Sequence, residues 1–394
     1  MRIGMFSECY EPVQNGVTTS VRTLVEQLRA LRHHVFVVAP HFSEHIDAGP
    51  FILRVPSVQT PLNRDYPFAY PWFPKLRRAI RRAAPDIVHS HNPFFVGMLA
   101  ARVARRLDLP LVSTYHTLYN HYAHYLSFLP EPAIQTALRW WIPEYYNRCA
   151  QVIVPSAVAE RSLRGYGVTA PVTAVPTAVP LPDPALLTPE ARLGARKRWG
   201  IGPDDPLLLY VGRIAREKNL ELVLAAFDAV WQRHPAARLL VVGGGPHLEE
   251  CRAAAQGLAG GARVRFAGPV PHDELTPVYA AADVFVFGST TETQGLVMAE
   301  ARAAGTPCVV ARGGGASETV RDGEDGFVVP PESAALAERV RWLLEDTRLR
   351  ARFRRNCLRN ARGHTPDAMA RRVLTVYDAA LAARVKPVAP TAPR

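Results

Sequence analysis

Short apolar runs alternate with longer stretches whose apolar residues recur every three or four positions in the first half of the chain. The first run, RIGMFS at Arg2–Ser7, is typical of a buried strand. After it, apolar residues fall on one helical face from about Gly16 to Leu31. The same reasoning predicts strands over 34–40, 52–56, 86–91, 111–117 and 151–156, and helices over 72–84 and 96–107. This alternation favours a doubly wound parallel sheet.

A Pro- and Ala-rich stretch, PVTAVPTAVPLPDP at Pro171–Pro184, interrupts the alternation and is typical of an interdomain linker. A second set of strands is predicted over 207–213, 237–245, 264–268, 283–288, 307–311 and 327–331, with helices between them. We therefore expect an α/β protein of two Rossmann-like domains, with parallel sheets facing across a ligand cleft. The expected boundaries are 1–175 for the first domain, 176–184 for the linker, 185–365 for the second domain, 366–384 for a final helix and 385–394 for a disordered tail.

Composition is that of a globular protein, because 48% of the 394 residues are hydrophobic, 21% are charged, and no apolar stretch reaches the length of a membrane span. The N-terminus lacks the apolar core of a signal peptide, and the five scattered cysteines show no metal or redox spacing, so a cytoplasmic location is expected. The formal charge of +12 indicates a polyanionic neighbour, either an anionic membrane surface or nucleic acid. An arginine- and alanine-rich composition would give the same excess without a functional cause.

Two carboxylates stand out in STTETQGLVMAEARAAGTP, the stretch that starts at Ser289. Glu292 is expected in a loop ahead of a helix, and Glu300 about two turns inside it, so roughly 10–12 Å separates them. That span suits a sugar nucleotide, with one carboxylate at the sugar hydroxyls and the other at the ribose. The free N–H groups of Gly295 and Leu296 would face a diphosphate between them. The alternative is a capped helix with a solvated second glutamate.

Arg213 and Lys218 lie at the end of a predicted strand and the start of a helix, in YVGRIAREKNLELVLAAF. Two cations at a helix N-terminus make a diphosphate clamp, although two solvated basic residues would give the same pattern. Gly16, in the turn Asn15-Gly16, would let the backbone approach a ligand closely, or would simply form a plain turn.

Sequence features that would indicate a cofactor or metal are absent or incomplete. The stretch VVGGGPHLEE fails the G-x-G-x-x-G pattern because Leu248 stands at the third glycine position, and neither a P-loop nor D-x-D occurs. His116 ends a predicted strand, where it could contact a sugar. His121 and His124 follow it without an acidic partner, a pattern that argues against a zinc site. We expect no metal site and no cofactor.

Aromatic and basic residues are interleaved over 66–86, where Trp72 and Phe73 precede five cations, Lys75, Arg77, Arg78, Arg81 and Arg82. Such a helix could lie on an anionic bilayer with its aromatics at the interface. It could also bind nucleic-acid phosphates, or form an ordinary solvated face behind core aromatics. A second aromatic-rich segment, 118–146, suits a lipid or another bulky acceptor, and ordinary core packing explains part of it.

Four motifs taken in order, EPVQNGVTTSV, STYHT, VGRIAREKNL and TETQGLVMAE, resemble the retaining glycosyltransferases of family 4, which have the two-Rossmann GT-B fold. The resemblance implies that Glu292 contacts the donor sugar and Glu300 the nucleotide ribose. It also implies that Arg213 and Lys218 hold the diphosphate, with the backbone near Gly16, Gly295 and Leu296 assisting. His116 matches the histidine at the sugar C6 hydroxyl, Val270 the place where main chain meets the base, and the final helix a segment that crosses back to the first domain.

Within that family, SECYEPVQNGVTTSV, YHTLYNHYAHYL and TETQGL are most similar to the bacterial diacylglycerol glucosyltransferases. That similarity implies metal-independent transfer, with retention, of a hexose from a UDP-sugar, with UDP-glucose the expected donor, to a membrane lipid such as 1,2-diacylglycerol. The expected partners are the nucleotide sugar, the lipid acceptor and the anionic inner face of the plasma membrane. No nucleic acid is expected, because no segment resembles a nucleic-acid-binding module. The alternatives are a GDP-mannose-dependent α-mannosyltransferase acting on a phosphoinositide or glycan, and a sugar-nucleotide epimerase on the same fold.

One departure from the family pattern is VPTAVPLPDP, in which Ala178 stands where relatives usually have glycine. It bears on the hinge geometry and not on the residues of the active site.

Overall fold

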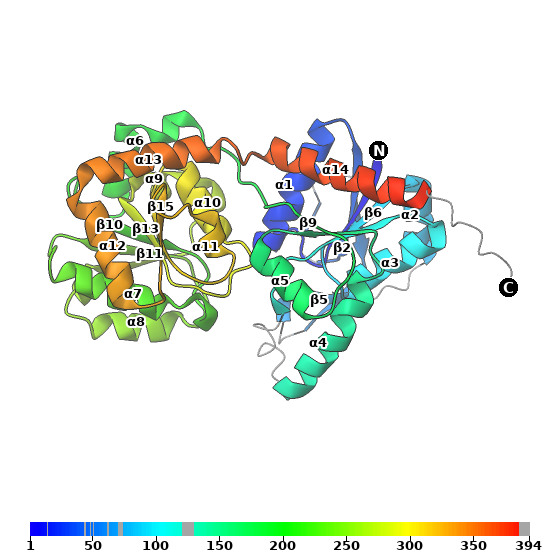
Figure 1. Ribbon diagram of the computed structural model, residues 1–394, viewed down its shortest axis with the longest axis horizontal. Helices are drawn as coiled ribbons and strands as arrows, with labels where there is room; N and C mark the ends of the chain where they lie inside the picture. The colour runs from blue at the N-terminus through cyan, green and yellow to red at the C-terminus, as the bar shows by residue number, and fades with distance from the viewer. Residues whose placement is uncertain are drawn as a thin grey trace. The chain divides into compact units, whose positions relative to one another are not determined.

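The chain divides into two compact units, one formed by Met1–Thr177 with the segment that starts at Pro366, the other by Ala178–Thr365. The structure, a computed structural model, describes residues 1–13, 15–42, 45–47, 49, 51–60, 63–69, 74–119 and 130–385 (Figure 1). The point of division lies inside the Pro- and Ala-rich stretch. Among the described residues, no helix is both long and apolar enough to span a bilayer.

A seven-stranded parallel sheet forms the centre of the first unit, in the order β3-β2-β1-β6-β7-β8-β9. Its middle strands are short and almost fully buried, which is why they read as continuous apolar runs in the sequence. The strands are β1 (Arg2–Phe6), β2 (His34–Pro40), β3 (Ile52–Val55), β6 (Ile87–Ser90), β7 (Leu111–Thr114), β8 (Gln151–Val154) and β9 (Val172–Ala174). A separate antiparallel pair consists of β4 (Ser57–Thr60) and β5 (Asn63–Ala69).

The second unit has a six-stranded parallel sheet in the order β12-β11-β10-β13-β14-β15. Strands β10, β13 and β14 are buried over their whole length, and the rings of Tyr210 and Phe287 stack across β10 and β13 with centroids 5.6 Å apart. The strands are β10 (Leu207–Val211), β11 (Arg238–Val242), β12 (Val264–Gly268), β13 (Val284–Phe287), β14 (Cys308–Ala311) and β15 (Gly326–Val329).

Helices connect the strands and cover the sheets of both units. The first unit contains α1 (Gly16–Ala30), α2 (Pro74–Ala83), α3 (Phe95–Leu107), α4 (Glu131–Tyr146), α5 (Ala157–Gly165) and α14 (Pro366–Val385). The second contains α6 (Pro189–Arg198), α7 (Leu220–Trp231), α8 (Leu248–Gln256), α9 (Leu275–Ala281), α10 (Leu296–Ala303), α11 (Ala316–Thr319), α12 (Ser333–Glu345) and α13 (Thr347–Ala361). The last helix, α14, in red in Figure 1, packs along α1, in blue, within the first unit.

Two sequence expectations need correction. The Pro- and Ala-rich stretch is not a linker throughout, because Val172–Ala174 forms β9 and pairs with β8. The pattern also failed to predict α4, which contains Pro143 and lies within the aromatic-rich segment 118–146. Its side chains Ile142, Tyr145 and Tyr146 are buried in the core of the first unit, so that part of the segment serves packing.

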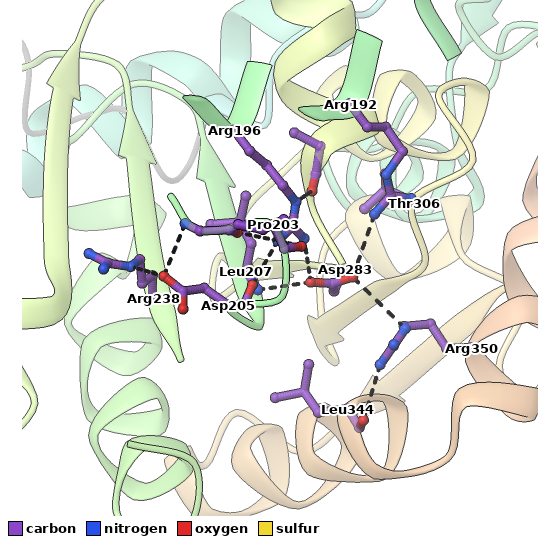
Figure 2. A network of polar contacts seen from close by, with 12 residues as sticks. Arg192, Arg196, Pro203, Asp205, Leu207, Arg238, Asp283, Thr306, Leu344 and Arg350 are labelled. Carbon is purple, nitrogen blue, oxygen red and sulfur yellow. Dashed lines mark hydrogen bonds and ion pairs between the residues drawn. The ribbon is translucent and has the colours of Figure 1, made fainter. Parts of the chain in front are cut away.

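A partly buried polar network anchors helices to the amino-terminal edge of the second sheet (Figure 2). Asp283, just before β13, accepts a 2.7 Å hydrogen bond from Arg196 of α6 and one of 2.9 Å from the backbone N–H of Leu207. Arg192 and Arg350 approach the same carboxylate at 3.6 and 3.9 Å. Burial and the neighbouring arginines lower the pKa of Arg192 to about 10. Asp283 therefore ties α6, α13 and two strands together.

Replacing Arg196 should destabilise the second unit. Arg196 is nearly buried and also donates to four backbone carbonyls, of Ala281, Gly202, Pro203 and Asp205. Arg196→Ala leaves the Asp283 carboxylate without its shortest side-chain contact, so we expect a loss of about 3 kcal/mol and a fall in Tm of roughly 6–12 °C in scanning calorimetry. Glu249→Ala, which removes the mostly exposed partner of Arg252, is the control and should change Tm little. Equal shifts for the two variants would contradict the anchoring role.

Candidate functional site

The connections of the second sheet change direction between β10 and β13, and the loops that follow these two strands carry the predicted donor-binding residues. In doubly wound sheets, ligands bind outside the carboxyl ends of the strands at this switch point. Lys218 donates to Oε1 of Glu292 across 2.6 Å, and the two side chains are only 14% and 16% exposed. The structure thus brings together a cation and a carboxylate that are 74 residues apart in the sequence.

Hydrogen bonds hold these two loops against each other. The hydroxyls of Ser289 and Thr291 both donate to the carbonyl oxygen of Glu217, at 2.9 and 3.1 Å. Gly288 allows this approach, because a Cβ at that position would lie 2.5 Å from the carbonyl oxygen of Asn219. The phenol of Tyr210 donates to the carbonyl oxygen of Arg213 at 3.2 Å, which fixes the backbone just after β10.

The loop that carries Glu292 runs into α10, whose first turn is open. Gly295 precedes the helix with a φ of 80°, and no side chain in the described part of the chain caps α10. The N–H groups at its start, near Gly295 and Leu296, lie at a positive helix end that favours an anion. The N–H of Gly315 donates to the carbonyl oxygen of Glu292 at 2.6 Å, and a Cβ on Gly315 would lie 2.0 Å from the carbonyl oxygen of Thr293.

Glu300 lies inside α10, as predicted, with a side chain that is 14% exposed. Its Oε2 accepts a 2.7 Å hydrogen bond from the phenol of Tyr279, and His272 Nδ1 is 3.9 Å from Oε1. Burial, followed by the charge of Glu300, raises the pKa of Tyr279 well above its usual value, so the phenol keeps its proton and donates. Two residues further, Arg302 forms a buried ion pair with Asp325 at 2.6 Å, which anchors the helix from behind.

His116 follows β7 in the first unit and is partly buried. Its Nε2 lies 3.0 Å from Nδ1 of His91, and burial lowers the pKa of His116 to about 4, so the ring is neutral at pH 7. Neither His91 nor His89 was predicted as a site residue from the sequence. The available signal was the spacing H-x-H at the end of a predicted strand, which places both side chains on one face of the sheet.

Gly16 and Val270 occupy loop-to-helix and strand-to-loop positions. Gly16 begins α1 directly after Asn15, whose side chain accepts a 2.8 Å hydrogen bond from the N–H of Thr18. Val270 follows β12 and packs, partly buried, against the core of the second unit.

Exposed arginines cover one side of α2. Leu76 and Ile80 are buried, whereas Arg77, Arg78, Arg81 and Arg82 are exposed. The helix therefore presents four cations to solvent and packs through its aliphatic residues. Trp72, Phe73, His121 and His124 lie outside the described residues, and so does the side chain of Lys75.

One group of described residues, Glu221, His247 and Cys251, has the composition of a metal site, with ligand atoms within 4.8 Å of one another. His247 Nε2 already contacts Oε1 of Glu221. Burial raises the pKa of the Cys251 thiol to about 12, so it is not a thiolate at neutral pH. The group includes none of the predicted donor-binding residues.

Glu8 occupies the switch point of the first sheet, where β1 and β6 are neighbours and the connections reverse. Its Oε1 accepts a 3.0 Å hydrogen bond from the N–H of Val96 in the first turn of α3, and its own N–H donates to Asn92 Oδ1 at 3.2 Å. Burial raises the pKa of the Glu8 carboxyl to about 7. This acidic group was not predicted as functional from the sequence.

Two family models match the chain: "Glycosyltransferase Family 4" over residues 14–182 and "Glycosyl transferases group 1" over 193–359. An alpha-monoglucosyldiacylglycerol synthase of Streptococcus pneumoniae is 34% identical over 321 residues, which are 79% of this chain and 71% of the relative. A GDP-mannose-dependent alpha-mannosyltransferase of Corynebacterium glutamicum is 30% identical over 358 residues, covering 88% and 82%. Among solved structures, Anabaena HepE in complex with UDP superposes with a TM-score of 0.75 at 19% identity, covering 96% of this chain and 100% of that one.

The raised pKa of Glu8 predicts a specific pH dependence of stability. Below about pH 4.5 the carboxyl is protonated in both the folded and the unfolded chain. As the pH rises towards 7, the unfolded chain loses this proton first, so stability falls until the folded carboxyl ionises. Glu8→Gln keeps the acceptor for Val96 and removes the titration. Its unfolding free energy relative to the original protein should therefore rise by about 3 kcal/mol between pH 4.5 and pH 8 in chemical denaturation. A difference independent of pH would contradict the raised pKa.

Proposed function

The chain belongs to glycosyltransferase family 4, and we propose that it transfers a hexose from a UDP-sugar, UDP-glucose being the expected donor, to a membrane lipid such as 1,2-diacylglycerol, forming an α-glycoside. The resemblance read from four sequence motifs, and the GT-B fold that it implied, are confirmed. The observation that carries the proposal is the Lys218–Glu292 pair at the switch point of the second sheet, beside the open first turn of α10.

In this proposal, the diphosphate of the donor binds where positive potential gathers. Lys218 and Arg213 supply two cations, and the N–H groups at Gly295 and Leu296 supply a helix end. Before the donor binds, Glu292 neutralises Lys218 and holds it in place. A phosphate would then take over the ammonium group, leaving the Glu292 carboxylate to accept from sugar hydroxyls.

The remaining site residues orient the rest of the donor. Glu300, held by Tyr279, offers a carboxylate to the ribose hydroxyls, and the main chain at Val270 meets the base. His116 contacts the hydroxyl at C6 of the sugar, and the backbone at Gly16 lies close to the donor. These last assignments rest on the family resemblance.

The proposed chemistry is transfer from the front face, with retention of configuration. The bond between the sugar C1 and the phosphate oxygen breaks as the acceptor oxygen bonds to C1 from the same side. The acceptor's proton passes to the departing phosphate oxygen. Arg213, Lys218 and the start of α10 stabilise the charge of the leaving nucleoside diphosphate, so neither a metal ion nor a cofactor is required.

The lipid acceptor is supported by the similarity to the alpha-monoglucosyldiacylglycerol synthase of Streptococcus pneumoniae and by the exposed arginines of α2. An exposed basic helix binds anionic headgroups without entering the hydrocarbon layer. We propose that the protein is cytoplasmic and sits peripherally on the inner face of the plasma membrane.

The Corynebacterium glutamicum relative supports a second candidate, a GDP-mannose-dependent α-mannosyltransferase with a phosphoinositide or glycan acceptor. The base and the sugar of the accepted donor separate the two candidates directly. An epimerase, the other alternative drawn from the sequence, would convert the donor without any acceptor.

The donor and the acceptor can be identified in one assay of glycosyl transfer. Purified protein, given anionic liposomes with diacylglycerol, EDTA and a panel of UDP- and GDP-sugars, should form an α-glycolipid from one UDP-sugar. Glu292→Gln should lower kcat/KM about 100- to 1000-fold, because it removes a charged contact to the reacting sugar. Mass spectrometry and the anomeric proton coupling of the product provide the measurement.

Glu249→Ala, an exposed substitution in α8, serves as the matched control and should keep full activity. Transfer from GDP-mannose alone would favour the second candidate. Conversion of the donor without any acceptor would favour the epimerase, and a requirement for a divalent ion would contradict the metal-independent chemistry.

A second prediction concerns α2. Replacing Arg77, Arg78, Arg81 and Arg82 together by glutamine should reduce co-sedimentation with anionic vesicles by roughly fivefold per arginine at low salt, because each cation contributes about 1 kcal/mol near such a surface. The matched variant with four lysines keeps the charge and should keep the binding. Equal loss in both variants, or binding insensitive to salt, would contradict an electrostatic contact with the membrane.

A further inference from the structure

Three histidine rings form a column at the carboxyl end of β6 and β7 in the first unit. The ring centroids of His89 and His91 are 4.3 Å apart, and those of His91 and His116 are 5.2 Å apart. His89 and His91 are buried, whereas His116 is partly exposed at the end of the column. The column thus leads from the interior of the unit to the histidine predicted to contact the sugar.

Each ring nitrogen of His91 has one neighbour. Nδ1 lies 3.0 Å from Nε2 of His116, and Nε2 lies 3.5 Å from the thioether sulfur of Met5. A thioether accepts a hydrogen bond weakly and cannot donate one. The nitrogen facing Met5 must therefore carry the proton of His91, because a bare lone pair there would be buried without a donor.

That assignment fixes the next hydrogen bond. Burial lowers the pKa of His91 well below its usual value and that of His116 to about 4, so both rings are neutral and each carries one N–H. With its proton on Nε2, His91 accepts at Nδ1, and His116 must donate from its own Nε2. Nδ1 of His116 is then a lone pair, and it has no hydrogen-bond partner among the residues that the structure describes.

The buried end of the column is fixed by side chains from two elements. His89 Nε2 lies 2.8 Å from the hydroxyl of Thr114 in β7, and His89 Nδ1 lies 2.7 Å from the phenol of Tyr377 in α14. Tyr377 also packs edge-on against the His89 ring, with centroids 5.6 Å apart. His91 thus packs, at a tilt of 33°, against a ring that cannot turn without breaking two hydrogen bonds.

We propose that His91 is a positioning residue that holds His116 in the tautomer protonated at Nε2, so that His116 presents a hydrogen-bond acceptor, and not a donor, to the transferred sugar. This inference rests on the proposed function for the identity of the ligand. The 6-hydroxyl of the donor must then donate to His116. A group of similar size that cannot donate, such as fluorine, gains nothing from this contact.

The tautomer can be measured in the free protein. With ¹⁵N-labelled histidine at pH 7, long-range ¹H–¹⁵N spectra should show His91 and His116 both protonated at Nε2, with signals assigned from His91→Phe and His116→Gln. Tyr377→Phe, which removes one hydroxyl from the far end of the column, should leave both tautomers unchanged. A proton on Nδ1 of His116, or a charged ring at pH 7, would overturn the proposal whatever the enzyme transfers.

Kinetics test the consequence for the sugar. His91→Phe keeps an aromatic ring without an acceptor, and kcat/KM for UDP-glucose should fall roughly three- to tenfold, as for one displaced hydrogen bond. For the 6-deoxy donor, which has no hydroxyl to position, the two proteins should be equal. The original protein should treat the 6-fluoro donor like the 6-deoxy donor. His91→Asn, which keeps an acceptor near the position of Nδ1, should recover most of the loss.

The outcomes separate the two proposals. An equal loss on the UDP-glucose and 6-deoxy donors would show that His91 acts only through folding and would overturn the positioning role. A 6-fluoro donor used better than the 6-deoxy donor would show that His116 donates. If the original protein transfers no sugar from any UDP donor, the proposed function fails, while the spectra still decide the tautomer.

Discussion

A parallel sheet brings the carboxyl ends of its strands to one edge, and at the strand pair where the connections reverse, no crossover helix covers that edge. Both units obey this constraint. In the second unit, Lys218 follows β10 and Glu292 follows β13, and the two side chains form their ion pair at this uncovered edge. In the first, the same constraint places Glu8 beside Asn92, and His116 one strand further along. The polar residues of each unit are gathered by topology, although they are scattered along the chain.

Two ion pairs near α10 have different roles: the Arg302–Asp325 pair stabilises the helix, and the Lys218–Glu292 pair lies at the proposed donor site. Arg302 and Asp325 are buried, and Asp325 also accepts from Asn360 and from the backbone of Arg321, so this pair fixes α10 permanently. Lys218 and Glu292 remain partly exposed, and a ligand phosphate can compete for the ammonium group. The helix α10 is thus anchored by a buried ion pair, while the ion pair near its start is accessible to solvent and to a ligand.

The sequence sufficed for elements whose signal is local. Strands such as β2, β10 and β13 are continuous apolar runs because both faces of the sheet are covered, and Glu292 and Lys218 were found individually from their motifs. The pairing of these two side chains, and the contact of His91 with His116, join residues 74 and 25 positions apart, which no local pattern reveals. Strand β9 and helix α4 were missed because prolines dominate their surroundings or interrupt them, and tertiary packing outweighs that local signal.

The last helix, α14, belongs to the first unit although the whole second unit precedes it in the chain. During synthesis, the whole second unit is therefore made before the first unit is complete. Ala178–Thr365 is a continuous segment and can fold as soon as it leaves the ribosome. The first unit receives Tyr377, the side chain that fixes His89, only afterwards. The histidine column therefore gains its contact with Tyr377 only after the whole of the second unit has been synthesised.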